Sequence, residues 1–246
     1  MGNKVLLAGI KDHSLYIHHL NRQGQLSSRQ AGSSGKVRFG NQTAVALDQE
    51  GNIAVLDGQY PAKLHFFTAE GALVETHKPS IQVFKHLNSL TMWRGKIFIA
   101  ESEKVVALFM DGTFSHEIHV PGNAMNVHIR ENEYMYITDS KSNIHIFPID
   151  HEGRISPGKI GYCMKVEDYP VSMSLRGPEI WMTHGQKKYI SVSTLSNDGM
   201  KTTRLLSHTG YVPLDMACDT KGHLYVAMGV SATAKAALRV FTLEAV

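Results

Sequence analysis

A pattern of short apolar runs, each bounded by turn-forming residues, recurs through most of the chain. Its clearest copy lies between Thr43 and Leu73, where the runs VAL, IAVLD and LHFF are separated by polar, Gly-containing turns. Apolar runs of this length between Gly, Asp and Asn are typical of antiparallel strands joined by tight turns. This stretch therefore predicts a meander of short strands, and its repetition restricts the possible folds.

The spacing of the repeat identifies the architecture. The second run of each copy ends at Asp57, Glu101, Asp139, His184 and Met228, which are 44, 38, 45 and 44 residues apart. One four-stranded unit of this length, repeated around an axis, is the pattern of a β-propeller. We predict an all-β propeller of six blades, each with about four antiparallel strands, in a single domain spanning 1–246. Five blades is the alternative.

The first and last units are incomplete. The N-terminal unit has runs that match the second, third and fourth strands, and the C-terminal unit has runs that match the first three. Propellers often close by completing one blade from both termini. Here the two pieces overlap, so the pattern does not predict how the ring closes. Cross-blade packing should bury the second-strand residues Phe98 and Trp181.

Composition favours an ordinary globular chain. Its 246 residues are 43% hydrophobic and 19% charged with a net charge of +3, which gives no reason to expect nucleic acid or a membrane as a partner. Cys163 and Cys218 are the only cysteines and lie in apolar runs, so we predict free thiols in a reducing compartment. The apolar run before Lys11 is too short for a secretory signal or a membrane span. The expected location is the cytoplasm.

The sequence contains no strong catalytic or metal-binding motif. It lacks G-x-S-x-G, G-x-G-x-x-G, the P-loop, H-E-x-x-H and C-x-x-C. The closest pairs among its 14 histidines are His18–His19 and His116–His119, and on a strand the members of each pair point to opposite faces. We therefore predict no metal and no cofactor.

Propeller geometry predicts where a binding site would lie. The starts of the first strands and the ends of the second strands share one rim, which carries polar residues from several units. Asp57 and Asp139, at second-strand ends, are expected to satisfy backbone N–H groups of the following turn. Glu101 and His184 replace that aspartate, and their longer side chains make them ligand-binding candidates. The candidates at first-strand starts are Asn88, Asn126 and Asp215.

His128 departs from the residue type at its position in the repeat. The equivalent first-strand residues are Ala46, Thr91, Ser174 and Ala217, which are all small. His128 and Asn126 are two residues apart, so their side chains share a face of the strand. Together with Asp215 they predict a group of imidazole, amide and carboxylate at the channel mouth. A neutral imidazole there could act as a general base, or it could be a packing residue that fills the channel.

Two segments, TAVALDQEGNIAVLD and PLDMACDTKGHLYVAM, resemble the inner half of an NHL-type repeat. This resemblance implies a six-bladed propeller of the broad class that includes gluconolactonase-like and strictosidine-synthase-like proteins. Gluconolactonase-like relatives hold a divalent metal at a position that matches Thr43, Asn88, Met125, Val171 and Leu214 here. Only Asn88 is a good oxygen ligand, and a hard cation needs several.

Two classes of function follow. The first is a non-enzymatic module that recognises a protein, a peptide or a small ligand at the channel-mouth rim, which the lack of catalytic motifs favours. The second is a metal-independent hydrolase, lactonase or lyase that acts on a small molecule around His128. A pocket with converging polar groups would favour the enzyme, and a flat rim would favour the scaffold.

Overall fold

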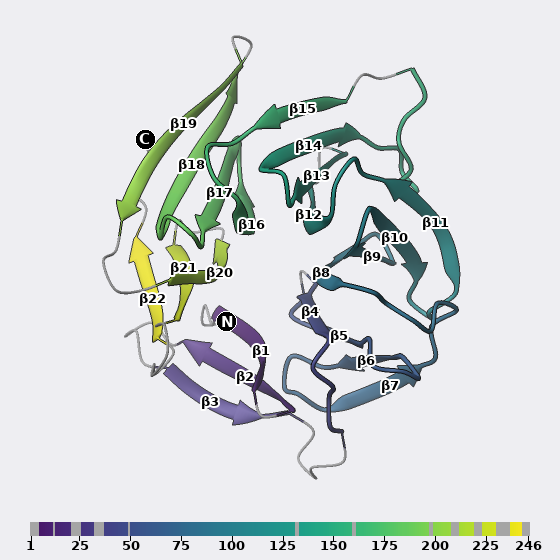
Figure 1. The fold of residues 1–246 in the computed structure, drawn as a ribbon. Coiled ribbons are helices and arrows are strands. Elements are labelled where there is room, and N and C mark those ends of the chain that lie inside the picture. The colour runs from purple at the N-terminus through teal and green to yellow at the C-terminus, as the bar shows by residue number, and fades with distance from the viewer. Residues whose placement is uncertain are drawn as a thin grey trace. The chain divides into compact units, whose positions relative to one another are not determined.

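The computed structural model divides into two compact units, Met1–His119 and Val120–Val246, which are described separately below. The residues described are 5–11, 13–20, 26–31, 37–48, 50–130, 133–158, 161–196, 199–207, 212–218, 223–229 and 237–242. All regular structure in them is β-strand (Figure 1). In this part of the chain, no helix has the length and apolar character needed to cross a membrane.

The first unit contains three antiparallel sheets of consecutive strands. Sheet 1 contains β1 (Val5–Lys11), β2 (Ser14–Leu20) and β3 (Leu26–Gln30). Sheet 2 contains β4 (Thr43–Leu47), β5 (Ile53–Asp57), β6 (Lys63–Phe67) and β7 (Leu73–His77). Sheet 3 contains β8 (Leu87–Trp93), β9 (Lys96–Glu101), β10 (Lys104–Phe109) and β11 (Phe114–His119).

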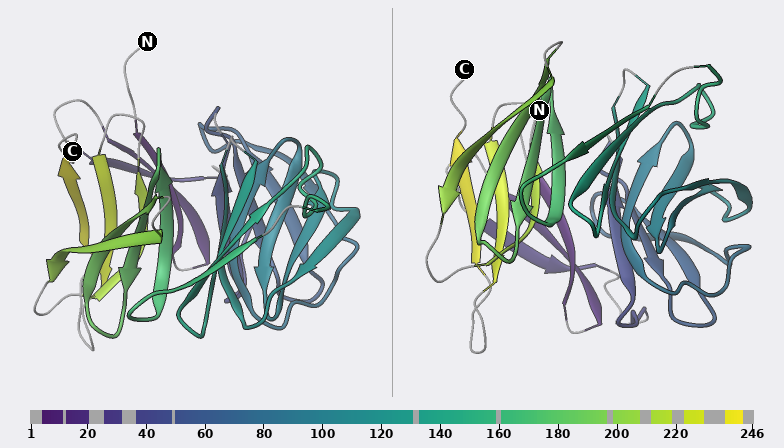
Figure 2. Two further views of the ribbon diagram at one scale, coloured as in Figure 1. Left: turned by 90° about the horizontal axis from the view of Figure 1, so that it is seen from above. Right: turned by 45° about the horizontal axis from the view of Figure 1, so that its top comes forward.

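The second unit contains three further sheets of the same kind. Sheet 4 contains β12 (Ala124–Arg130), β13 (Tyr134–Asp139), β14 (Asn143–Pro148) and β15 (Tyr162–Lys165). Sheet 5 contains β16 (Pro170–Arg176), β17 (Glu179–His184), β18 (Tyr189–Ser196) and β19 (Gly199–Ser207). Sheet 6 contains β20 (Val212–Cys218), β21 (His223–Gly229) and β22 (Ala237–Thr242). Figure 2 shows the twist of the individual sheets.

The predicted fold class, an all-β propeller with six blades, is confirmed by these six antiparallel sheets. Sheets 1 and 6, which correspond to the two units predicted to be incomplete, each contain three described strands, while the other four sheets contain four. The single domain spanning 1–246 stays a prediction, because the chain divides into two compact units.

Burial explains why these runs form strands. The second strands β5, β9, β13 and β17 are buried along nearly their whole length, as expected for strands with apolar side chains on both faces. In the first unit, Leu56 and Leu64 of sheet 2 pack with Ile97 and Ile99 of sheet 3. In the second unit, sheets 4 and 5 form a cluster of Tyr136, Ile144, Ile146, Met173, Ile180 and Met182. These apolar layers hold the first strands in fixed positions.

The predicted burial of Phe98 and Trp181 is confirmed, with exposures of 0% and 4%. The expectation of apolar surroundings is wrong for Cys163, which is exposed because it lies on the outermost strand β15 of its sheet. Cys218, on β20, is partly buried, and both residues are free thiols in the structure.

Candidate functional site

The first strands of four sheets share a β-bulge near their beginning. The register shifts fall at Asn88, Met125, Val171 and Leu214, on β8, β12, β16 and β20. These are four of the five positions for which the resemblance to gluconolactonase-like proteins implies correspondence with a metal-binding position. A bulge changes the direction in which the following side chains point. In all four strands the next residue is polar: Ser89, Asn126, Ser172 and Asp215.

In the second unit three of these bulged strands are neighbours. β16 contacts β12 on one side and β20 on the other (Figure 1). We call the four polar residues Asn126, His128, Ser172 and Asp215 on these strands the inner-strand row. The row contains three of the six ligand-binding residues predicted from the sequence.

Hydrogen bonds join the row across the strands. The Asn126 amide donates to the backbone oxygen of Val171 at 2.8 Å and to the Thr138 hydroxyl at 3.3 Å. The Ser172 hydroxyl donates to Oδ1 of Asp215 at 2.6 Å. Asn126 and Ser172 are buried, so these bonds fix the first strands relative to one another.

The Asp215 carboxylate is held in place but remains accessible. Its Oδ1 also accepts a hydrogen bond from its neighbour's backbone, Met216 N–H, at 2.8 Å. The residue is exposed, while its partner Ser172 is 4% exposed. A carboxylate fixed through one oxygen in this way presents a negative charge at a defined position.

His128 lies on the same strand face as Asn126, as predicted, because both residues keep regular pairing with β13. Burial lowers the pKa of His128, although the charge of Asp215 and a hydrogen bond to the Met173 backbone act in the opposite direction. The imidazole is therefore neutral at pH 7, and it is partly exposed.

The row does not have the contacts of a Ser-His-Asp triad. In a triad the histidine lies between the hydroxyl and the carboxylate. Here the Ser172 hydroxyl bonds directly to Asp215, and His128 bonds to the backbone of Met173. This arrangement presents hydrogen-bond acceptors to a ligand and does not activate Ser172 as a nucleophile.

The ends of the second strands fasten the preceding and following connections. The prediction that Asp57 and Asp139 cap the following turns is confirmed, since Asp57 accepts the Gln59 N–H at 3.1 Å and Asp139 accepts the Lys141 N–H at 2.8 Å. Glu101 instead binds the connection that precedes its sheet, accepting the Lys85 N–H at 3.0 Å.

His184 is bound on both sides of its ring. Its Nδ1 lies 3.0 Å from the backbone oxygen of Asp168, and its Nε2 lies 2.8 Å from the Ser191 hydroxyl. The ring also stacks on Tyr189, with centroids 4.1 Å apart. His184 and Glu101 are 1% and 5% exposed, so these bonds hold connections in place inside the protein.

Asn88 and Glu101 belong to the first unit. Asn88 is the bulged residue of β8 and is partly exposed. Among the residues that the structure describes, no three His, Cys, Asp or Glu side chains gather in a way that could hold a metal ion.

The chain resembles solved structures in its fold. One structural match, to a Lactobacillus plantarum protein, spans 100% of this chain and 80% of that protein's chain, with 12% sequence identity and a TM-score of 0.70. A second match, to a chain in the nidogen–laminin complex, spans 97% of this chain and 93% of that chain, with 12% sequence identity and a TM-score of 0.68. A third match, to a Bacteroides fragilis protein named for 6-phosphogluconolactonase activity, spans 97% of this chain and 77% of that protein's chain, with 14% sequence identity and a TM-score of 0.65. No family model and no curated protein matches the chain by sequence. At these identities the likeness shows a shared fold alone.

Proposed function

We propose that this chain is a non-enzymatic binding protein, built from NHL-like repeats, whose inner-strand row recognises a protein or peptide partner in the cytoplasm. The observation that carries the proposal is the accessible Asp215 carboxylate, fixed by the buried Ser172 hydroxyl at 2.6 Å. A fixed carboxylate beside a neutral imidazole suits a ligand that brings hydrogen-bond donors, such as a lysine or arginine side chain.

The second candidate is a metal-independent hydrolase, lactonase or lyase with His128 as general base. The lowered pKa of His128 supports it, because an imidazole that is neutral at pH 7 can accept a proton. Against it stands the hydrogen bonding of the row, in which Ser172 and His128 have separate partners.

Replacement of His128 by alanine tests the proposal. Peptides selected from a displayed random library would serve as probes, with affinity measured by calorimetry and stability by thermal unfolding. If the row binds the partner, His128→Ala lowers affinity at least about tenfold with little change in stability. If His128 only packs, stability falls by about 1 to 3 kcal/mol and affinity is unchanged. The second outcome contradicts the proposal.

Thr91→Ala is the matched control, since Thr91 has the equivalent position on β8 of the first unit. It should leave peptide affinity unchanged. An assay with small lactones and esters distinguishes the enzyme from the binding protein. Turnover of one of these compounds that is abolished by His128→Ala would identify the chain as an enzyme.

A further inference from the structure

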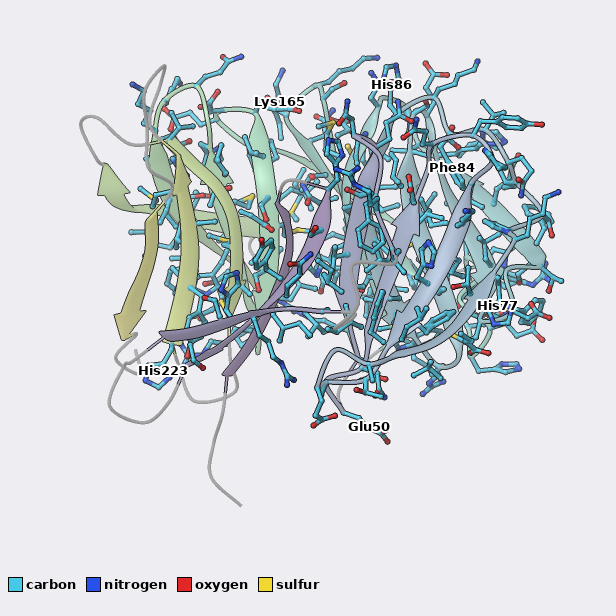
Figure 3. All side chains as sticks on the ribbon, turned by 90° about the horizontal axis from the view of Figure 1, so that it is seen from below. Glu50, His77, Phe84, His86, Lys165 and His223 are labelled. Atoms are coloured by element: carbon cyan, nitrogen blue, oxygen red, sulfur yellow. The ribbon has the colours of Figure 1, made fainter. Side chains whose placement is uncertain are left out.

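A pocket at one end of the first unit lies between three connections. It is formed by the segment before β4, the β5–β6 turn and the β7–β8 connection, and its volume is about 340 Å³. Its walls and floor include Asn41, Gln42, Gln59, Tyr60, Val83 and Phe84. In Figure 3, Phe84 and His86 mark this end, and Glu50 marks the other end of the unit. The volume is within the range of small-molecule sites.

One buried carboxylate orders two of the three connections. Asp57 is 9% exposed, and its Oδ2 accepts the Gly40 N–H while its Oδ1 accepts the Gln59 N–H, both at 3.1 Å. Between these bonds, the Gly58 N–H donates to the backbone oxygen of Gln42 at 2.8 Å. The backbone of these two connections is therefore held in place before any ligand arrives, which reduces the entropy lost on binding.

The walls are also tightly packed against each other. A methyl group at Gly40 would lie 2.7 Å from Cβ of Gln59, so only glycine allows this approach. The floor is Phe84, which is 3% exposed and belongs to the core cluster shared by sheets 2 and 3. The pocket thus has a rigid apolar floor and polar walls.

The side chains that line the pocket carry no charge. Three are exposed carboxamides, from Asn41, Gln42 and Gln59, and each can both donate and accept hydrogen bonds. Tyr60 and Val83 add apolar surface and are 74% and 65% exposed. An exposed tyrosine offers a flat apolar ring and a polar hydroxyl to a ligand.

These features match an uncharged ring that carries several hydroxyl groups. Hydroxyls donate and accept, as carboxamides do, and the C–H face of such a ring can lie against an aromatic side chain. A charged ligand would find no counter-ion in the lining. We propose that this pocket binds an uncharged sugar residue, either a free sugar or the terminal residue of a glycan.

The experiment is saturation-transfer NMR on the full chain. The probes are D-glucose, D-galactose, D-mannose and N-acetyl-D-glucosamine, each as free sugar and as methyl glycoside. A ligand of this size should bind with a dissociation constant of the order of millimolar. Binding of both forms indicates a glycan terminus, and binding of the reducing sugar alone indicates a free sugar. Saturation transfer to none of the probes would overturn the proposal, as would tighter binding of glucuronate than of glucose.

Variants locate the binding. Tyr60→Ala and Gln42→Ala should each weaken binding by about tenfold, and Tyr60→Phe should retain it because the ring remains. Tyr162→Ala is the matched control, since Tyr162 is also an exposed tyrosine but lies on β15 of the second unit. Equal binding by Tyr60→Ala and the unmodified chain would overturn the assignment, as would equal losses in Tyr60→Ala and Tyr162→Ala. His128→Ala should leave sugar binding unchanged, so this inference and the proposed function fail separately.

Discussion

The Ser172 hydroxyl donates a 2.6 Å hydrogen bond to the Asp215 carboxylate, which joins first strands of adjacent sheets in the second unit. The distance is that of a charge-assisted bond, which is shorter and stronger than a bond between neutral groups. The bond unites two roles, because it fastens β16 to β20 and fixes the carboxylate that we propose as a ligand group. A substitution at Ser172 should therefore affect both the stability of this unit and the recognition that we propose for it.

Ser172→Ala should lower the free energy of unfolding by about 1 to 2 kcal/mol. The substitution removes the donor to Asp215, and the exposed carboxylate can recover only part of the loss from water. Urea unfolding monitored by tryptophan fluorescence measures the change. Ser140→Ala, at an exposed serine of the same unit, should change stability by less than about 0.5 kcal/mol. Equal effects of the two substitutions would show that the bond contributes nothing.

Asp139→Asn should destabilise the protein at pH 7 and much less in acid. Burial raises the pKa of Asp139, but hydrogen bonds from Asn143, His145 and the Lys141 backbone outweigh it and lower the pKa below its ordinary value. A carboxyl group with a lowered pKa stabilises the fold above about pH 4, and this contribution disappears as the pH falls through the folded-state pKa. At pH 7 the loss should be about 2 to 3 kcal/mol.

Urea unfolding of both proteins between pH 7 and pH 3 measures this effect. Asp111 and Asp150 also have a lowered pKa, but they are present in both proteins, so the difference isolates Asp139. The prediction fails if the difference in stability between the two proteins is the same at every pH.

The repeat could be predicted from the sequence because strand and turn signals are local. The second strands β5, β9, β13 and β17 end at the predicted residues Asp57, Glu101, Asp139 and His184. The bulges could not be predicted in this way. In a bulge, two residues of one strand lie opposite a single residue of the neighbouring strand. Whether a bulge forms therefore depends on the partner strand as well as on the apolar pattern.

The candidate site was predicted only in part for the same reason. The shared strand face of Asn126 and His128 follows from their spacing, and the structure confirms it. The bond between Ser172 and Asp215 joins residues 43 positions apart on different sheets. No local signal specifies such a pair, because it depends on how closely neighbouring first strands pack. The exposure of Cys163 has a similar cause, since an apolar run does not reveal that its strand is outermost.

His128→Gln should reduce the dependence of stability on pH below pH 6.5. Burial lowers the pKa of His128, so the folded state favours the neutral ring and the unfolded state binds the proton more tightly. The stabilising contribution is complete above the unfolded-state pKa of about 6.5 and is lost as the pH falls from there toward the folded-state pKa. His18 and His65 are shifted in the same direction but are present in both proteins. Thermal unfolding at several values between pH 7.5 and pH 5 measures the difference, and parallel curves would contradict the prediction.

Cys163 should react with iodoacetamide more slowly than N-acetylcysteine at neutral pH, although it is exposed. Burial of the thiol, followed by the charge of Asp139, raises the pKa of Cys163, so less of the reactive thiolate is present. Mass spectrometry of tryptic peptides measures the rate at each cysteine. Asp139→Asn should accelerate alkylation of Cys163, and an unchanged rate would show that the charge has no influence. The same spectra under non-reducing conditions test the prediction of free thiols, which a Cys163–Cys218 disulfide would contradict.

Gly71→Ala should destabilise the first unit more than Gly158→Ala destabilises the second. Both glycines have a positive φ, +78° and +74°, so each substitution carries a similar backbone cost of about 1 kcal/mol. They differ in their surroundings. A methyl at Gly71 would lie 2.7 Å from Cδ1 of Ile17 and 3.0 Å from Cβ of Ala31, while a methyl at Gly158 would meet nothing within 4 Å.

The difference between the two variants therefore measures the packing of the β6–β7 turn against sheet 1. Ile17 is 0% exposed and belongs to the core cluster of sheets 1 and 2, so it cannot move without disturbing that cluster. Overpacking of this kind costs about 1 to 3 kcal/mol beyond the backbone term. Urea unfolding of the two variants gives the comparison. Equal losses would mean that the Ile17 side chain yields freely and that the turn is only loosely packed on sheet 1.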